Sequence, residues 1–278
     1  MKHAAPAEDT SRGTGQQESA SAVVAIQDEG PVRWITLNRP GRRNALNQVM
    51  IRALRDAIGQ AAADRGVRVI GLRGAGKDFC AGADLLELRL GADPVESLEE
   101  AQALGDLFCE IRVAPKPVVA AVRGRALAGG CGLATACDIV LASGESLFGY
   151  PEVKLGFVPA MVMAMLRRAT GEKRAFDLVT SGEPVTALRA AELGLVTRVL
   201  PSDGFARGAS EFAAALAARS ASALALTKRL FHATDTTGFE DAIRAGAHVN
   251  ALARATEDCQ EGIRKFLTRK ASTDTESG

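Results

Sequence analysis

The sequence predicts an α/β fold in which repeated β-β-α units are followed by a helical C-terminal region. Between residues 22 and 204, short runs of β-branched and apolar residues alternate with segments whose apolar residues recur every three or four positions. From about Phe205 onward the chain is rich in alanine, keeps the helical period and contains no further strand signal. We therefore expect a disordered tail over 1–21, a β-β-α core over 22–204, a helical region over 205–270 and a disordered tail over 271–278.

The elements of the core can be placed in chain order. Five strands are expected, over 22–26, 32–37, 67–72, 117–122 and 138–142. Between the second and third strands, the apolar residues follow a helical period from Asn44 to Ala61, with Asn44 or Asn47 as the helix cap. Residues 85–115 are charged and periodic, which predicts a helix and a mobile connection. The glycine- and alanine-rich run after Val122 is expected to open another helix.

Composition excludes several classes of function. The chain has 278 residues and balances 34 Lys and Arg against 33 Asp and Glu, a net charge of +1, so we expect neither a nucleic acid nor a membrane as partner. Its five cysteines have neither zinc-site nor disulfide spacing, and its three histidines share no metal-ligand spacing, so we expect no metal. No run is apolar enough to span a membrane, and the N-terminus has no signal-peptide core. A cytoplasmic protein is expected.

Three segments carry the candidate chemistry: FCAGADL (79–85), RGRALAGGCGLATACDIVLAS (123–143) and FGYPEVKLGFVP (148–159). The first is a loop of small residues whose backbone N–H groups are accessible to a ligand oxygen. In the second, Gly129 stands at the start of a helix, where free N–H groups meet the positive end of the helix dipole. N–H groups that converge from these two loops would form an oxyanion hole. In the third segment, Glu152 lies among apolar residues, and partial desolvation of its carboxylate suits it to proton transfer near neutral pH.

Taken together and in this order, these segments resemble the crotonase, or enoyl-CoA hydratase/isomerase, superfamily. The resemblance covers nearly all of residues 22–270. Beside the three segments above it rests on LNRPGRRNAL (37–46), KPVVAAV (116–122), GEPVTALRAAELGLVTRVLP (182–201) and EGIRKF (261–266). It implies a spiral of β-β-α turns that binds an acyl-CoA thioester, followed by a helical trimerisation region. The partner implied for that region is another copy of the chain, in a homotrimer or a dimer of trimers.

The resemblance also implies roles for individual residues. The backbone N–H groups of Ala83 and Gly129 match the donors that hold the thioester oxygen. The remaining matches concern CoA, which arrives as part of the substrate, so that no separate cofactor is expected. They are Arg42, Arg43, Ala45, Ala81 and Asp84 around the adenine end of CoA, and Phe266 and Arg269 toward the CoA of a neighbouring subunit. Residues 85–107 are expected to cover the acyl group, and residues 158–161, Met163 and Met165 to line it.

One departure from the family pattern concerns the reaction itself. Hydratases of the family use two glutamates, and Glu152 matches one of them, whereas the position of the other is occupied by Gly132. A lone Glu152 favours double-bond isomerisation, or a weak hydration, through an enolate held in the oxyanion hole. Asp84 or Glu87 could replace the missing glutamate. The alternatives are another enolate-type reaction of an acyl-CoA (thioester hydrolysis, dehalogenation, decarboxylation or carbon–carbon cleavage) and a non-catalytic acyl-CoA-binding protein.

Overall fold

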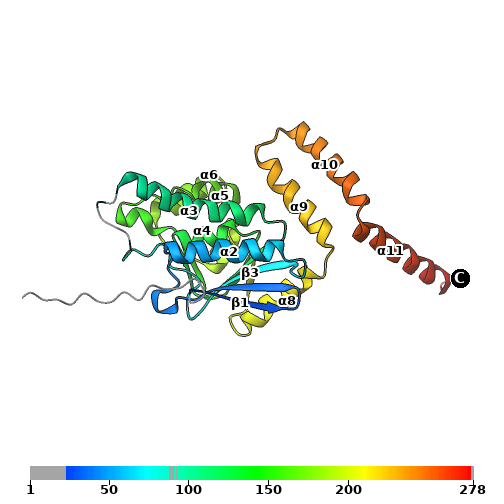
Figure 1. Ribbon diagram of the computed structural model, residues 1–278, viewed down its shortest axis with the longest axis horizontal. Coiled ribbons are helices and arrows are strands. Elements are labelled where there is room, and N and C mark those ends of the chain that lie inside the picture. The colour runs from blue at the N-terminus through cyan, green and yellow to red at the C-terminus, as the bar shows by residue number, and fades with distance from the viewer. Residues whose placement is uncertain (1–22, 88–90, 92, 277–278) are drawn as a thin grey trace, which may run out of the picture.

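A computed structural model describes residues 23–87, 91 and 93–276, and it has a mixed α/β core with helices that extend from one end (Figure 1). The main sheet has six strands in the order β1-β2-β3-β4-β6-β9. They are β1 (Val24–Glu29), β2 (Val32–Leu37), β3 (Val69–Gly74), β4 (Val118–Val122), β6 (Ile139–Ser143) and β9 (Arg198–Leu200). Only β1 and β2 pair antiparallel, across a tight turn at Gly30, and each later pair in this sheet is parallel.

A smaller sheet lies beside the main one and carries the segments of chemical interest. Its strand order is β5-β7-β8, with β5 (Arg125–Leu127), β7 (Leu147–Gly149) and β8 (Val185–Thr186). β5 leads directly into the helix α4 (Gly129–Ala136), and β7 leads directly into the short 3₁₀ helix η2 (Pro151–Leu155). Because β5 and β7 are adjacent and parallel, the starts of α4 and η2 are brought to the same edge of this sheet.

Both faces of the main sheet are covered, because its strands place alternate side chains on opposite sides. On one face, Ile35 and Leu72 join the large apolar core together with α2 (Gln48–Ala63) and α3 (Pro94–Val113). On the other face, Trp34 and Val119 pack against α8 (Phe205–Ala217). The remaining elements of the core are η1 (Pro40–Arg42), α5 (Met163–Thr170), α6 (Glu172–Ser181) and α7 (Ala187–Leu193).

The last helices leave the core and are nearly unburied in this single chain. They are α9 (Ala221–Ala233), the short η3 (Thr234–Thr236), α10 (Phe239–Arg254) and α11 (Glu257–Glu276), and they extend away from the sheet (Figure 1). Lys228 is the buried residue of α9, and α10 has none. Large apolar side chains remain exposed along them, among them Phe231, Phe239, Ile243, Leu252, Ile263 and Phe266.

The structure confirms the α/β fold class, and it differs from the predicted elements in several places. The helix predicted from Asn44 begins at Gln48, because the buried Asn44 side chain bonds to backbone groups of Arg39, Ala75 and Asp78 while Asn47 caps the helix. The short strands β5, β7, β8 and β9 were not predicted, since two or three residues carry no measurable period.

At the C-terminal end, two differences concern the predicted boundaries. α8 is packed on the sheet and belongs to the core, so the projecting helices begin after it and not at 205. α11 continues to Glu276, past the end predicted at 270, because no glycine or proline interrupts this stretch. The predicted N-terminal tail lies outside the described residues.

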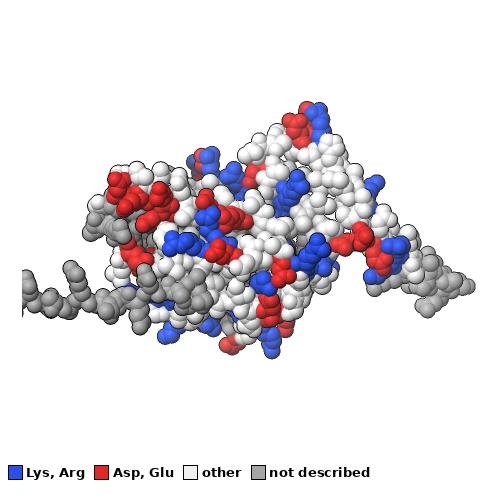
Figure 2. All heavy atoms as spheres, viewed as in Figure 1, with Lys and Arg blue, Asp and Glu red and all other residues white. Residues whose placement is uncertain are grey.

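Two surface properties bear on the predicted partners. Figure 2 shows Lys and Arg side chains interspersed with Asp and Glu side chains over the face in view, as a net charge of +1 leads us to expect. Within the described residues, no helix is both long enough and apolar enough to cross a membrane.

Candidate active site

The loop 79–84 and the start of α4 lie against each other at the edge of the smaller sheet. The Cys80 N–H donates to the Arg125 carbonyl at 3.1 Å, and the Leu127 N–H donates to the Cys80 carbonyl at 3.0 Å. A Cβ on Gly130 would lie 2.3 Å from the Cys80 oxygen, and a Cβ on Gly82 would lie 2.8 Å from the Ala128 Cβ. The two loops can approach this closely only because these positions are glycine.

The two predicted oxyanion donors are brought to this contact. Ala83 lies between two hydrogen bonds to Leu46, because the Leu46 N–H donates to the Gly82 carbonyl at 2.7 Å and the Asp84 N–H donates to the Leu46 carbonyl at 2.9 Å. Gly129 is the first residue of α4. Among the described residues, neither the Ala83 N–H nor the Gly129 N–H has a hydrogen-bond acceptor. Both N–H groups are therefore available to a ligand oxygen.

Ala128 holds an unusual backbone conformation just before Gly129. Its φ of 49° and ψ of −128° lie in a backbone region that residues other than glycine rarely adopt. The conformation is fixed from both sides, because the Ala128 N–H donates to the Gly149 carbonyl at 2.8 Å and its carbonyl accepts from the Gly132 N–H at 2.9 Å. Backbone strain of this kind is found at functional sites, and here it sets the direction of the next N–H, that of Gly129.

Glu152 lies in η2, which is anchored against α4. The Tyr150 hydroxyl is 2.9 Å from the Thr135 hydroxyl, within hydrogen-bond distance. Glu152 itself is half-buried, and its Oε2 atom is fully buried with no hydrogen-bond partner among the described residues. Burial raises the pKa of the Glu152 carboxyl above its ordinary value. Burial, with a smaller contribution from Glu152, raises the pKa of the Cys131 thiol to about 12, so Cys131 is an uncharged neighbour of this carboxylate.

The space in front of Gly132 is filled by apolar side chains. A Cβ at this position would lie 2.5 Å from Val162 Cγ1 and 3.0 Å from Phe108 Cζ. Both Val162 and Phe108 are buried members of the core. A carboxylate side chain at position 132 would therefore collide with these two side chains.

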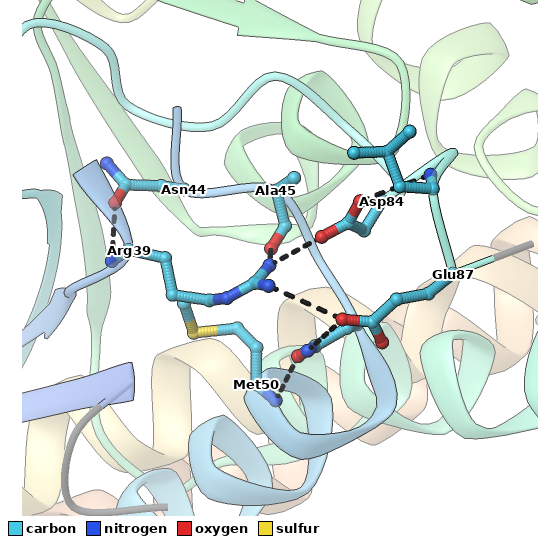
Figure 3. Close-up of polar contacts among 8 residues, drawn as sticks. Arg39, Asn44, Ala45, Met50, Asp84 and Glu87 are labelled. Carbon is cyan, nitrogen blue, oxygen red and sulfur yellow. Dashed lines mark hydrogen bonds and ion pairs between the residues drawn. The ribbon is translucent and has the colours of Figure 1, made fainter. Parts of the chain in front are cut away.

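The two acids suggested as replacements are held by other side chains (Figure 3). The Asp84 carboxylate is 2.9 Å from Arg39 Nη1 in a buried ion pair. Glu87 Oε1 accepts from Asn47 Nδ2 at 2.8 Å and lies 3.4 Å from Arg39 Nη2. Each of these carboxylates is thus occupied at the junction with η1 and α2, whereas among the described residues the Glu152 Oε2 atom is buried without a hydrogen-bond partner.

The residues predicted around CoA fall into two groups. The Ala81 N–H donates to the Arg43 carbonyl at 3.0 Å, so the segments that carry Arg42, Arg43, Ala45, Ala81 and Asp84 are adjacent, and the side chains of Arg42 and Arg43 are exposed. Phe266 is exposed on α11, which projects away from the core (Figure 1). The side chain of Arg269 lies outside the described residues. All of these assignments stay predictions.

The predicted acyl-binding region is described only in part, since residues 88–90 and 92 lie outside the description. Met163 is exposed and Met165 is buried. The side chains nearest to a Cβ on Gly129 are Leu104 at 3.5 Å and Leu46 at 3.6 Å. The sequence reasoning missed Arg39, Leu46 and Phe108, because their proximity depends on contacts between segments far apart in the chain. The Asn-Arg-Pro sequence around Arg39 was the one local signal.

Comparisons with known proteins concern the chain as a whole. A sequence model of the enoyl-CoA hydratase/isomerase family matches residues 27–274. The chain is 44% identical over 247 residues to a Thermus thermophilus protein that bears an enoyl-CoA hydratase name, with 87% of this chain and 97% of that protein covered. It is 36% identical over 248 residues to the 2,3-dehydroadipyl-CoA hydratase of Escherichia coli, with 89% and 96% covered.

Solved structures of proteins with enoyl-CoA hydratase names also match this chain. The enoyl-CoA hydratase of Mycobacterium smegmatis superposes with a TM-score of 0.86 at 32% identity, over 89% of this chain and 96% of that one. Human enoyl Coenzyme A hydratase domain-containing protein 3 superposes with a TM-score of 0.86 at 30% identity, over 89% of this chain and 98% of that one.

Proposed function

Because this chain belongs to the enoyl-CoA hydratase/isomerase family, we propose that it moves the double bond of an enoyl-CoA thioester, with Glu152 as the one general acid/base. The observation that carries the proposal is the filled space at position 132. Val162 and Phe108 occupy the volume that a second glutamate would need, whereas the Glu152 Oε2 atom is buried and has no hydrogen-bond partner in the part of the chain that the structure describes. One carboxylate can relay one proton between two carbons, but an attacking water needs a second polar group to hold it.

The reaction is a proton transfer in two steps. The thioester oxygen of a 3-enoyl-CoA accepts hydrogen bonds from the Ala83 and Gly129 N–H groups. The Glu152 carboxylate removes a proton from C2, and the electron pair of that C–H bond passes into the conjugated enolate, whose charge rests on the thioester oxygen. The protonated Glu152 then gives its proton to C4, the electrons return, and the double bond lies between C2 and C3. No atom is gained or lost.

The surroundings of Glu152 suit both steps. Burial raises the pKa of its carboxyl toward that of the C2 proton, so the carboxylate is a stronger base in the first step, while the carboxylic acid remains far more acidic than the carbon that it protonates in the second. The neighbouring Cys131 thiol has a pKa of about 12 and stays uncharged, so it does not compete for the proton. The loss of one oxyanion donor in other enzymes costs about 2.7–4 kcal/mol, which is the scale of stabilisation proposed for each N–H here.

We expect CoA to be bound by the two groups of residues described above, one in the core and one on α11. The adjacent segments with Arg42 and Ala81 would hold the adenine end of CoA, with the exposed arginines near its phosphates. The exposed apolar residues of α9 to α11 support a homotrimer or a dimer of trimers in which these helices are covered, and in which Phe266 and Arg269 reach the CoA of a neighbouring subunit. A cytoplasmic location stays a prediction.

A hydratase is the second candidate, and the relatives favour it. The Thermus thermophilus and Escherichia coli relatives bear hydratase names, at 44% and 36% identity. In that case a water molecule would have to be activated by Glu152 alone, and we expect a slow reaction.

Product analysis by mass spectrometry distinguishes the two candidates. Purified protein is incubated with a medium-chain 3-enoyl-CoA and, separately, with the matching 2-enoyl-CoA. Accumulation of the double-bond isomer with little 3-hydroxyacyl-CoA supports isomerisation. Formation of 3-hydroxyacyl-CoA from the 2-enoyl-CoA at a comparable or higher rate would overturn it in favour of hydration. Glu152→Gln is the control, because either activity should be lost in this variant.

A further inference from the structure

We propose that Arg39 and Asp84 are positioning residues that fix the direction of the Ala83 N–H, and this inference rests on the oxyanion hole of the proposed function. Asp84 follows Ala83 directly in the chain. Its carboxylate is 2.9 Å from Arg39 Nη1, and the two side chains are only 7% and 5% exposed. The backbone that follows the Gly82–Ala83 peptide, which carries the Ala83 N–H, is therefore anchored by a buried charged group.

The same nitrogen atom of Arg39 joins the two walls of the site (Figure 3). Arg39 Nη1 donates to the Ala45 carbonyl at 2.8 Å as well as to Asp84. Ala45 precedes Leu46, whose N–H and carbonyl bond to Gly82 and Asp84 on either side of Ala83. The guanidinium thus holds together the two short backbone stretches, 45–46 and 82–84, between which the orientation of the Ala83 N–H is set.

Further bonds connect this pair to a rigid element. Glu87 Oε1 lies 3.4 Å from Arg39 Nη2 and accepts from Asn47 Nδ2 at 2.8 Å. The Asn47 side chain in turn accepts from the Met50 N–H at 2.9 Å and caps α2. The planar guanidinium of Arg39 is therefore held on several sides. Through Glu87 and Asn47, the loop after Ala83 is anchored to the helix α2.

A buried ion pair is a poor device for stability alone, because two charges lose their hydration when they are buried and an apolar pair of similar size often stabilises the fold as well. In this site the Arg39–Asp84 pair serves to fix the direction of the Ala83 N–H. An oxyanion donor contributes only when it is aimed at the oxygen before the reaction begins, so the supporting groups must hold it to within a fraction of an ångström. Arg39 and Asp84 supply that support through the backbone on either side of Ala83.

The test measures carbonyl polarisation and turnover in the same set of full-length variants. The probe is a 3-aryl-2-enoyl-CoA, whose absorption shifts to longer wavelength when hydrogen bonds polarise its thioester carbonyl. The variants are Asp84→Asn, Arg39→Lys and the double variant Arg39→Met/Asp84→Leu, which replaces the charged pair with an apolar one. The matched control is Asp138→Asn, which breaks another ion pair, that of Asp138 with the buried Lys228 at 2.7 Å, beyond the far end of α4.

We expect the variants at 39 and 84 to lose most of the red shift and about tenfold in kcat, part of the roughly 10²–10³ that removal of a whole donor costs, with KM little changed. The double variant should regain thermal stability but not the shift or kcat. Asp138→Asn should lose stability and keep the shift. A double variant that regains the shift together with stability would overturn the inference, since the pair would then be merely structural.

The absorption shift separates this inference from the proposed reaction. If the wild-type protein binds the probe with a red shift that the Asp84→Asn variant loses, but does not move double bonds, the positioning role stands and isomerisation fails. If the wild-type protein gives no shift on binding, the oxyanion hole is absent and the positioning role is overturned with it.

Discussion

A methyl group added at position 132 tests the packing on which the proposed reaction depends. Gly132 lies inside α4, where alanine is favoured over glycine by about 1 kcal/mol. The new Cβ would lie 2.5 Å from Val162 Cγ1 and 3.0 Å from Phe108 Cζ, well inside van der Waals contact. Val162 is β-branched and fully packed, so it cannot rotate away, and such overpacking costs about 1–3 kcal/mol. We expect Gly132→Ala to lower the free energy of unfolding by between zero and about 2 kcal/mol, the difference of these two effects.

The matched control is Gly105→Ala in α3, where a Cβ would meet nothing within 4 Å. This variant keeps the helix gain without the clash and should be more stable than the wild type by about 1 kcal/mol. The two alanine variants should therefore differ by about 1–3 kcal/mol in urea denaturation. In a Val162→Ala background, Gly132→Ala should cost less than in the wild type, because the clashing Cγ1 atom is gone; the coupling measures the contact directly.

The refuting result is equally concrete. If Gly132→Ala is as stable as Gly105→Ala, there is free space in front of position 132, and the argument against a second carboxylate fails. The same conclusion would follow from a Gly132→Glu variant that folds with wild-type stability and hydrates a 2-enoyl-CoA.

Three further predictions use other parts of the site. Glu152→Gln should lower kcat by about 10²–10⁴-fold, and the kcat/KM of the wild type should rise with pH through a pKa above the ordinary glutamate value, because only the carboxylate removes a proton and burial raises that pKa. Because the folded state holds this proton more tightly than the unfolded chain does, ionisation of Glu152 destabilises the fold above the raised pKa and has no effect on stability below the pKa of the unfolded chain. Glu152→Gln should therefore be at least as stable as the wild type at pH 7, and this gain in stability should vanish in acid. A variant that is less stable than the wild type in urea at pH 7 would contradict this. Ala128→Gly should raise the free energy of unfolding by about 1 kcal/mol, because relief of about 1–3 kcal/mol of strain exceeds the roughly 0.5–1 kcal/mol entropic cost of glycine, and a lower melting temperature would refute the strain at φ 49°. Lys228→Met should destabilise the chain by about 3–5 kcal/mol, since it leaves the Asp138 carboxylate without its buried cation at 2.7 Å; unchanged urea denaturation would show that the pair contributes nothing.

The fold class, and the segments that form the candidate site, could be predicted from sequence because their signals are local. The strand over 32–37 was placed to the residue, and α2 was expected from its three- and four-residue apolar spacing. The glycine-rich start of α4 and the Pro-Glu pair at 151–152 were both found where the structure has them at one edge of the smaller sheet. The C-terminal helices were expected because alanine-rich periodic sequence admits little else.

What the sequence alone determined was therefore which residues are candidates for the chemistry: two loops of small residues and one carboxylate, with Gly132 where a second carboxylate was expected. Tertiary structure decided what these residues meet. Val162 and Phe108 fill the space at Gly132, and Arg39 forms an ion pair with Asp84. These contacts join residues that are 24 to 45 positions apart in the chain. No period or motif encodes such contacts, because they arise when separate segments are packed together at interior density, where a single methyl group decides whether a side chain fits.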